Sequence, residues 1–158
     1  MRFQDYIVES TTKASRDAFK AAKAVPADKQ EWKPLDLGRS VLDQCRELAK
    51  TPDWAYDIIA GEKEPDWSAE GMAEQQKEMS TWTTVEQCEQ ECNKRLERYF
   101  NLVRGFPDEK LTTTKWLPYD GGRDFTVMEM MEYPRWNYGY HEGQIAYIQT
   151  LYGDKEMH

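Results

Sequence analysis

The clearest structural signal in this chain is the stretch TVMEMMEYPRWNYGYHEGQIAYIQTLYG (residues 126–153). Its apolar residues recur every three or four positions along one face, which is typical of an amphipathic helix. They are Val127, Met130, Pro134, Tyr138, Ile145, Ile148 and Tyr152. Thr126 and Glu129 form a capping box, in which a hydroxyl and a carboxylate three residues apart satisfy free amides at a helix start. The stretch therefore predicts a helix over residues 126–153.

Two segments elsewhere have the same periodicity. Residues 2–24 place an apolar stripe opposite lysines and arginines, and we expect this stripe to be buried. It consists of Phe3, Tyr6, Ile7, Ala14, Ala18 and Ala21. A second segment begins at Thr83 or Thr84, each followed three residues later by a capping Glu or Gln, and ends before Pro107. Its stripe is the cleanest in the chain and comprises Val85, Cys88, Cys92, Leu96, Tyr99, Phe100, Val103 and Phe106.

A fourth helix is predicted from Ser40 to Gly61. The Ser40 hydroxyl can cap a free amide at its start, and Pro52 inside it removes one amide donor. Residues 61–82 are polar and predict a long connection with a helical piece at 69–78. The segment KLTTTKWLPYDGGRDF (residues 110–125) predicts an extended excursion that can pair as a hairpin. Four amphipathic helices joined in this way predict an all-α four-helix bundle, with residues 1–158 forming one domain.

Composition excludes several classes of protein. The chain has 158 residues, only 9 Gly and 7 Pro, and 13% aromatic residues, which is a globular composition of one-domain size. No apolar run approaches the roughly 18 residues of a membrane span, and no secretory signal is visible, so we expect a cytoplasmic protein. The net charge of −8 repels phosphate backbones, so we expect no nucleic-acid partner.

His141 is the most informative side chain for function. It falls in the middle of the apolar stripe of residues 126–153, with Asn137 one turn before it and Gln144 one turn after. A buried imidazole requires hydrogen-bond partners or a metal. Two interpretations remain open: a core histidine bonded within the protein, and a ligand or catalytic residue.

The helix over residues 40–61 offers partners for this imidazole. Glu47 lies at the margin of its apolar stripe, and Gln44 points more nearly inward but is a poor metal ligand. Zinc bound by His141 and the chain's three thiols is a further alternative. Because these thiols occupy positions of apolar stripes, we favour free cysteines that pack in the core; they are Cys45, Cys88 and Cys92.

Two strings resemble motifs of a known family. NYGYHEGQIAYIQTLYGD (137–154) resembles the last helix of DinB-like four-helix bundles, a family that includes the YfiT-type metal-dependent hydrolases and typically reads H-x-x-x-H-x-G-Q-I there. EWKPLDLGRSVLDQCREL (31–48) is similar to the family's W-x-P followed by a G-R-S helix start and, seven residues after the serine, a histidine. The resemblance covers nearly the whole chain in architecture and implies the same fold.

The resemblance also implies a divalent metal, nickel or zinc, held by three histidines. The corresponding positions here are Glu47, Asn137 and His141, and only His141 keeps the family's residue. A carboxylate and an amide are harder donors than two imidazoles, and the amide is a weak one for nickel or zinc. The alternative is a metal-free cluster in which the same three side chains bond to one another.

Three functions remain open. The first is the one that the resemblance implies, a metal-dependent hydrolase or a transferase that uses a low-molecular-weight thiol. The second is a bundle without metal that binds a small molecule in a pocket whose mouth carries Trp116, Tyr119 and Trp136. The pocket residues predicted for either case are Gln44, Gln144, Tyr138 and Trp136. The third is a structural homodimer, for which the alanine-rich stripe of residues 2–24 allows close helix contact.

Overall fold

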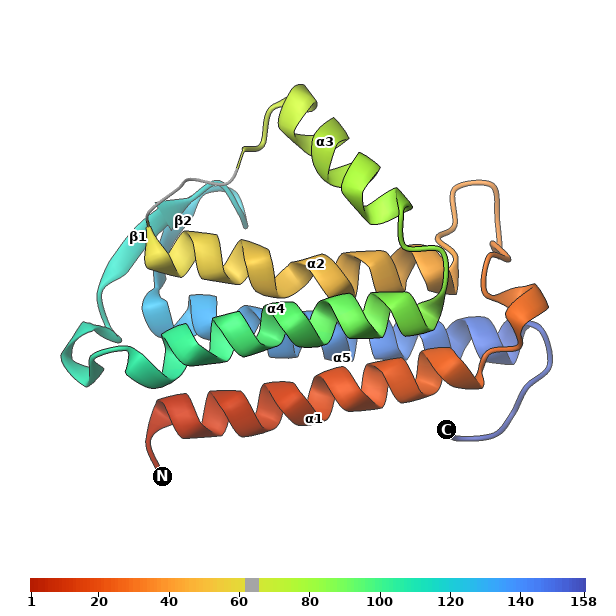
Figure 1. Ribbon diagram of the computed structural model, residues 1–158, viewed down its shortest axis with the longest axis horizontal. Coiled ribbons are helices and arrows are strands. Elements are labelled where there is room, and N and C mark those ends of the chain that lie inside the picture. Colours follow the sequence, from red (N-terminus) through yellow and green to blue (C-terminus); the bar gives the residue numbers. More distant parts are fainter. Residues whose placement is uncertain (62–65) are drawn as a thin grey trace.

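The computed structural model describes residues 1–61 and 66–158. Long helices dominate this part of the chain, with two short 3₁₀ turns at Ala27–Lys29 and Asp108–Lys110. The α-helices are α1 (Phe3–Ala24), α2 (Val41–Ala60), α3 (Ala69–Ser80), α4 (Val85–Gly105) and α5 (Val127–Leu151), and two strands precede α5, β1 (Thr114–Leu117) and β2 (Arg123–Thr126). The predicted four-helix bundle is confirmed: α1, α2, α4 and α5 lie side by side (Figure 1).

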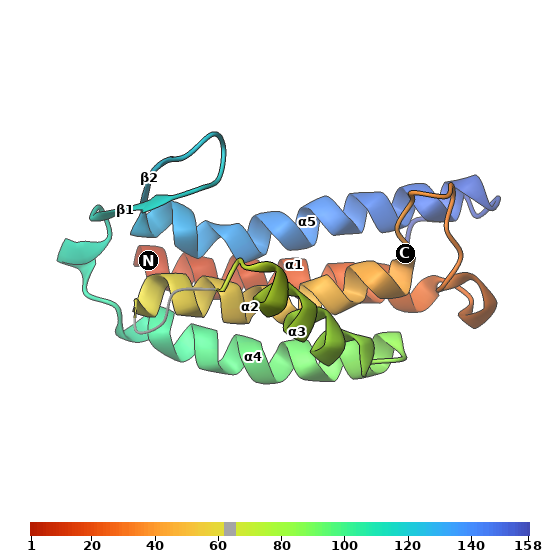
Figure 2. The same ribbon diagram turned by 90° about the horizontal axis from the view of Figure 1, so that it is seen from above.

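The packing order differs from the order along the chain. Helices α1 and α2 each pack mainly against α4 and α5, so α1 and α2 lie diagonally across the bundle. As Figures 1 and 2 show, α2 and α4 run in the same direction, and so do α1 and α5. A connection that includes α3 must therefore return along the outside of the bundle between α2 and α4.

Hydroxyl caps fix where the helices begin. The side chains of Ser40, Thr84 and Thr126 each accept a hydrogen bond from the amide three residues later, at 3.1 to 3.2 Å. At α5 the Glu129 carboxylate also accepts from the Thr126 amide at 2.7 Å, which completes the predicted capping box. These contacts satisfy amides that would otherwise have no partner in the first turn.

Pro52 leaves a carbonyl that the core satisfies. Proline has no amide hydrogen, so the Leu48 carbonyl, four residues before it, lacks its usual helical donor. The Tyr138 hydroxyl donates to this oxygen at 3.3 Å, and the Cys92 thiol lies 3.7 Å from it. Helix α2 continues without interruption to Ala60. Tyr138 thus ties α5 to α2 at the point where the helix backbone lacks a bond.

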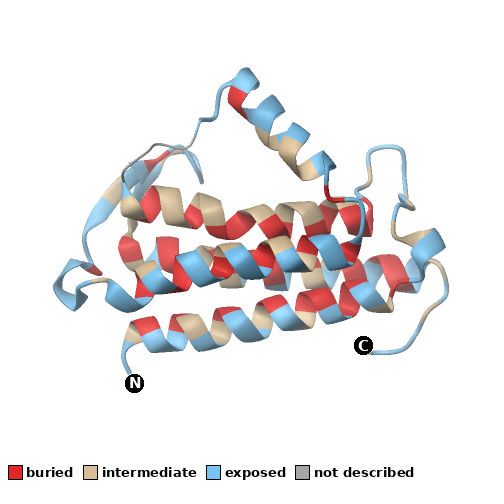
Figure 3. Ribbon diagram, viewed as in Figure 1, coloured by how far each residue is buried: buried red, intermediate tan, exposed pale blue. Residues whose placement is uncertain are grey.

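The buried face of α1 is more polar than its predicted stripe. Ile7, Ala18 and Ala21 are buried, but Tyr6 is 42% exposed, so the prediction that it lies in the core is wrong. Gln4, Thr11 and Ser15 are buried in its place. Gln4 is accommodated because its amide nitrogen donates to the Phe106 carbonyl and to Asp108 beyond α4. Figure 3 shows the buried residues along the inward sides of the bundle helices.

The segment between α4 and α5 forms the predicted hairpin. Strands β1 and β2 are antiparallel, with Thr114 opposite Thr126 and Leu117 opposite Arg123. The turn requires left-handed backbone at Asp120, Gly121 and Gly122, which glycine adopts without strain. The hairpin extends from the end of the bundle at which α5 begins (Figure 2), beside α2 and α5.

Outside the bundle, α3 is anchored by charged and polar contacts. The Glu78 carboxylate contacts Lys50 of α2 at 2.8 Å and Arg95 of α4 at 2.6 Å. The indole nitrogen of Trp54 donates to the Gln75 side-chain oxygen at 2.6 Å. These contacts hold α3 across α2 and α4 and fix the position of Trp54.

Candidate functional site

The His141 ring lies between α5 and α2, and 2% of its side chain is exposed. Its Nδ1 lies 3.0 Å from Oε1 of Gln44, and its Nε2 lies 3.0 Å from Oε1 of Glu47. Gln44 and Glu47 are three residues apart and therefore share one face of α2. Both partners that the sequence placed near His141 are in contact with it.

Asn137 extends the same set of contacts by one turn. Its amide nitrogen donates to the Thr51 hydroxyl at 2.9 Å and, more weakly, to Oε1 of Glu47 at 3.4 Å. The Thr51 hydroxyl in turn donates to the Glu47 carbonyl at 2.9 Å. We call these five residues, Gln44, Glu47, Thr51, Asn137 and His141, the polar cluster.

Glu47 connects the polar cluster to the surface. A quarter of its side chain is exposed, and its second oxygen, Oε2, lies 2.5 Å from Nη1 of Arg39. Arg39 also contacts the Asp43 carboxylate at 2.7 Å. Burial of the Glu47 carboxyl would raise its pKa, but hydrogen bonds from His141 and Arg39, together with their charges, lower this pKa to about 2. Glu47 is therefore ionised at neutral pH.

The bonding of His141 limits what it can do chemically. Both ring nitrogens face acceptor oxygens, so a ring with one proton satisfies only one of them and a ring with two protons satisfies both. A general base requires a ring nitrogen that faces the substrate. The arrangement therefore holds α2 and α5 in register and leaves neither imidazole nitrogen turned to solvent.

The polar cluster does not fit a divalent metal. Within residues 1–61 and 66–158, no group of three or more His, Cys, Asp or Glu side chains could hold a metal ion. Both oxygens of Glu47 are occupied, one by His141 and Asn137 and the other by Arg39. The adjacent Arg39 guanidinium also repels a cation. The polar cluster as it is bonded therefore offers a cation no open carboxylate oxygen.

A second feature, a cleft of about 800 Å³, lies beside the polar cluster. Ten apolar or aromatic residues from α2, the segment before α3, the hairpin and α5 line it: Trp54, Ala55, Ile58, Trp67, Leu117, Tyr119, Phe125, Met130, Tyr133 and Trp136. Five charged residues complete the lining, namely Asp120, Arg123, Glu129, Glu132 and Arg135. We call this feature the aromatic cleft. Two other hollows among the described residues, of about 390 and 420 Å³, are more polar.

The aromatic cleft and the polar cluster occupy successive turns of the same two helices. Trp54 follows Thr51 by three residues on α2, and Tyr133 precedes Asn137 by four on α5. The charge of Glu47 contributes, after burial, to the raised pKa of Tyr133. A row of stacked rings on α5 also links the cleft to the polar cluster. Tyr133 stacks on Trp136, and Trp136 stacks on Tyr140. The Tyr140 ring meets the His141 ring edge-on, with 5.2 Å between the ring centroids.

The structure separates the four predicted pocket residues. Trp136 lines the aromatic cleft and is 56% exposed, and Gln44 belongs to the polar cluster. Tyr138 lies in the core, fully buried, where its hydroxyl contacts Leu48 and the Cys92 thiol. Gln144 is partly exposed, and its side-chain oxygen has no partner among the described residues.

Other side chains singled out in the sequence lie apart from the site. Trp116 does not line the cleft, because side chains alternate along β1 and it covers Gly122 on the opposite face from Leu117. The three thiols are free and buried as predicted, and burial raises the pKa of each. They form no metal-binding group with His141 in the described part of the chain.

Sequence reasoning missed several residues of both features. Trp54 had a signal, since it follows the inward Thr51 by one turn on α2. Arg39 lies in the loop just before the capping residue of α2, and its side chain contacts Glu47 eight residues later, which helical spacing does not predict. Trp67 and Tyr133 reach the aromatic cleft only through tertiary packing.

Three solved structures resemble this fold. YfiT from Bacillus subtilis, described as a probable metal-dependent hydrolase with an unusual four-helix bundle topology, matches with a TM-score of 0.76 and 14% identity over 95% of this chain and 87% of its own. The colibactin self-resistance protein ClbS, solved in complex with a dsDNA, matches with a TM-score of 0.66 and 13% identity over 93% of this chain and 95% of its own. A conserved protein from Enterococcus faecalis matches with a TM-score of 0.65 and 13% identity over 96% of this chain and 97% of its own.

These likenesses establish the fold. The chain has the YfiT-like, DinB-like four-helix bundle that its two motifs predicted, and identities this low show the fold alone. No family model and no curated protein matches the sequence. Across the described residues, every helix is too short or too polar to cross a membrane.

Proposed function

We propose that this chain binds a small organic molecule in the aromatic cleft without the help of a metal. The observation that supports the proposal is the cleft itself, which is of the size and apolar character typical of ligand sites. Exposed aromatic side chains gather around it, with Trp67, Tyr119 and Trp136 each at least 40% exposed. Large exposed apolar groups gathered at one place mark interaction sites.

The polar cluster supports this function by positioning the two helices that form the cleft walls. Its hydrogen bonds join α2 to α5 one turn beyond Trp54 and Tyr133. Because a satisfied buried network holds its elements in one arrangement, the cleft is formed before the ligand arrives. A preformed site loses less free energy to ordering when it binds.

Thermal-shift and calorimetric titration with flat aromatic fragments, in chelator and in added zinc or nickel, test the proposal. We expect binding that is indifferent to the chelator. Trp136→Ala should weaken it about tenfold, the effect of losing one aromatic contact. Tyr147→Ala is the matched control, because Tyr147 is an exposed aromatic on the same helix that does not line the cleft. The proposal would be refuted if the two variants lost affinity equally, or if the wild-type protein bound none of the fragments.

A second candidate function is metal-dependent hydrolysis or thiol transfer at Glu47, Asn137 and His141. The description of the YfiT structure as a probable metal-dependent hydrolase favours it. In this case a divalent metal, nickel or zinc, would activate a water or a low-molecular-weight thiol.

Elemental analysis after loading with each metal and dialysis distinguishes the candidates. The second candidate requires about one retained ion per chain, lost in Glu47→Gln with the fold checked by circular dichroism. Our first proposal expects no retained metal in either protein.

A further inference from the structure

We infer that the aromatic cleft takes a neutral, flat aromatic molecule that carries a hydrogen-bond-accepting oxygen. This inference rests on the proposed binding function and adds the chemical class of the ligand. It follows from the charges, the hydrogen-bond donors and the ring arrangement of the cleft lining.

The charged residues of the cleft lining neutralise one another. Arg123 contacts the carboxylates of Asp120 at 3.3 Å and Glu129 at 3.0 Å, and its guanidinium lies over the Phe125 ring. Arg135 lies 3.9 Å from Glu132. Three carboxylates against two guanidinium groups leave a single negative charge in excess. Among the described residues of the lining, an anionic ligand therefore meets a net negative charge, and a cationic one finds no carboxylate without an arginine beside it.

Four of the five uncharged side chains of the lining that can donate a hydrogen bond have no partner among the described residues. Trp67, Tyr119, Tyr133 and Trp136 form no side-chain hydrogen bond to any residue in the described part of the chain, whereas Trp54 donates to Gln75. An indole nitrogen can only donate. Burial raises the pKa of Tyr119 to about 12, and burial with the charge of Glu47 raises that of Tyr133, so both phenols keep their protons at neutral pH. Such a lining is complementary to acceptor oxygens.

The rings of the lining favour a flat occupant. Trp67 and Tyr119 meet edge-to-face at 5.6 Å, and this contact joins the segment before α3 to the hairpin. On α5, Tyr133 and Trp136 stack at 6.2 Å with 28° between their planes. Both pairs line the cleft, so a flat ring system bound there can contact aromatic rings from the segment before α3, the hairpin and α5. The volume of about 800 Å³ accommodates two or three fused rings.

A matched series of naphthalenes tests the inference by calorimetry on the full chain. Acetonaphthone is neutral with an acceptor oxygen, and ethylnaphthalene has the same size without one. Naphthoate is the anion, and naphthylmethyl-trimethylammonium is the cation. We expect acetonaphthone to bind about tenfold more tightly than ethylnaphthalene, which is the effect of one hydrogen bond. We expect both charged probes to bind more weakly than acetonaphthone.

Variants that remove only a hydroxyl identify the donors. In Tyr133→Phe, Tyr119→Phe or the double variant, the affinity for acetonaphthone should fall to that for ethylnaphthalene, while ethylnaphthalene itself binds unchanged. Tyr147→Phe is the control and should alter neither. The rings remain in every variant, so a change in packing cannot mimic the result.

The outcomes separate this inference from the function on which it rests. Equal affinities for acetonaphthone and ethylnaphthalene would overturn the inference and leave the binding function standing. Tightest binding of the ammonium probe would identify a cation cage instead and would also overturn it. If no naphthalene and no fragment binds, the proposed function itself fails.

Discussion

The two ends of the interface between α2 and α5 use their polar groups in opposite ways. At the end formed by Glu47 and His141, the side chains bond to one another and the imidazole is almost fully buried. At the end formed by Tyr133 and Trp136, the polar atoms are donors without partners among the described residues, and the rings are partly exposed. Both ends lie on α2 and α5, which are neighbours in the bundle (Figure 1).

This difference separates stability from recognition. A buried polar network is favourable only when its members are all paired, so the polar cluster must be complete within the folded chain. Donors that remain in contact with water lose little when unpaired and can bond to a ligand later. Stability should therefore respond to changes in the polar cluster, and binding to changes in the aromatic cleft.

The largest effect on stability is expected from Glu47→Ala. The variant leaves His141 Nε2 without its acceptor and removes one of the two acceptors of the Asn137 amide. Loss of one member of a largely buried pair should lower the free energy of unfolding by about 3 kcal/mol, measured by urea denaturation. Glu74→Ala, which removes an exposed carboxylate, is the control and should have almost no effect. Equal changes in the two variants would contradict the role assigned to the polar cluster.

The pH dependence of stability should change next most strongly. The pKa of Glu47 is about 2 in the folded chain and about 4.5 when unfolded, so its contribution is complete above pH 4.5 and is lost as the pH falls toward 2. Between pH 5 and pH 3, the wild type should lose about 2 kcal/mol more than Glu47→Gln does. Other acidic groups titrate alike in both proteins and cancel in this comparison. Parallel stability curves for the two proteins would show that Glu47 is not paired as described.

A smaller loss is expected where the polar cluster borders the aromatic cleft. Thr51→Val keeps the shape of the side chain but removes the acceptor of the Asn137 amide, which retains only its longer contact to Glu47. We expect the free energy of unfolding to fall by about 1 kcal/mol. Thr12→Val on the exposed side of α1 is the matched control. If Thr51→Val leaves the free energy of unfolding unchanged, Thr51 does not contribute to stability, and the stabilising part of the polar cluster ends nearer to Glu47.

The smallest effect on stability is expected in the cleft itself. Trp136→Ala should change the free energy of unfolding by no more than about 0.5 kcal/mol, since more than half of this side chain is exposed. The same variant is expected to weaken ligand binding about tenfold. A large destabilisation here would mean that Trp136 belongs to the core, and the contrast between the two ends would no longer hold.

Much of the fold was predictable because its signals are local. The caps at Ser40, Thr84 and Thr126 and the glycine turn of the hairpin depend only on residues a few positions apart. Tyr6 was misplaced for the opposite reason. Its spacing fits the apolar stripe of α1, but Gln4 is buried instead, because its partner Asp108 lies more than one hundred residues away in the sequence.

The site was predictable to the extent that helix faces determine it. Glu47, Asn137 and His141 converge because the spacing on α2 and α5 turns them toward each other, and their role in metal binding stays a prediction. Arg39 was not predictable, since a loop places it. The aromatic cleft needs three separate segments around α5, and of its rings the sequence pointed only to Tyr119 and Trp136.

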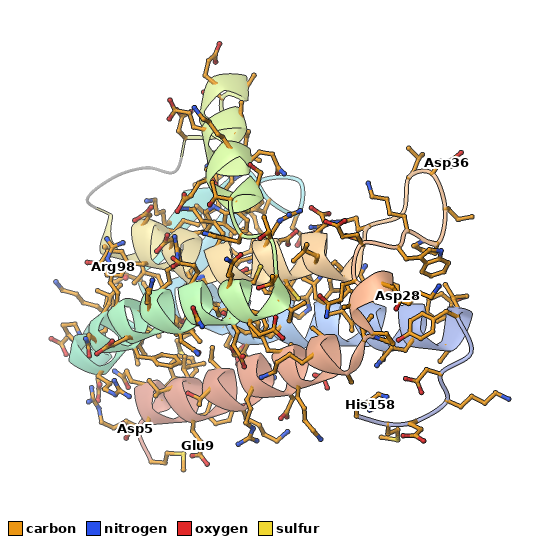
Figure 4. All side chains as sticks on the ribbon, turned by 45° about the vertical axis from the view of Figure 1, so that its right-hand side comes forward. Asp5, Glu9, Asp28, Asp36, Arg98 and His158 are labelled. Carbon is orange, nitrogen blue, oxygen red and sulfur yellow. The ribbon has the colours of Figure 1, made fainter. Side chains whose placement is uncertain are left out.

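Other expectations from the sequence stay predictions. Acidic side chains such as Asp5, Glu9, Asp28 and Asp36 point outward at different parts of the molecule (Figure 4), which accords with weak affinity for nucleic acid. A gel-shift assay tests this expectation, which the dsDNA complex of ClbS makes worth performing. The predicted homodimer is tested by sedimentation, and the cytoplasmic location by fractionation.

The pairing of α1 with α5 has a consequence for synthesis on the ribosome. Although they are neighbours in the bundle, α1 ends about one hundred residues before α5 begins, so α1 emerges well before its partner. Until then its apolar stripe is covered mainly by α4, and α2 lacks the imidazole that pairs with Glu47. Nascent chains that stop before α5 should therefore be sensitive to protease and dependent on chaperones, and closure of the bundle should coincide with release of the final helix.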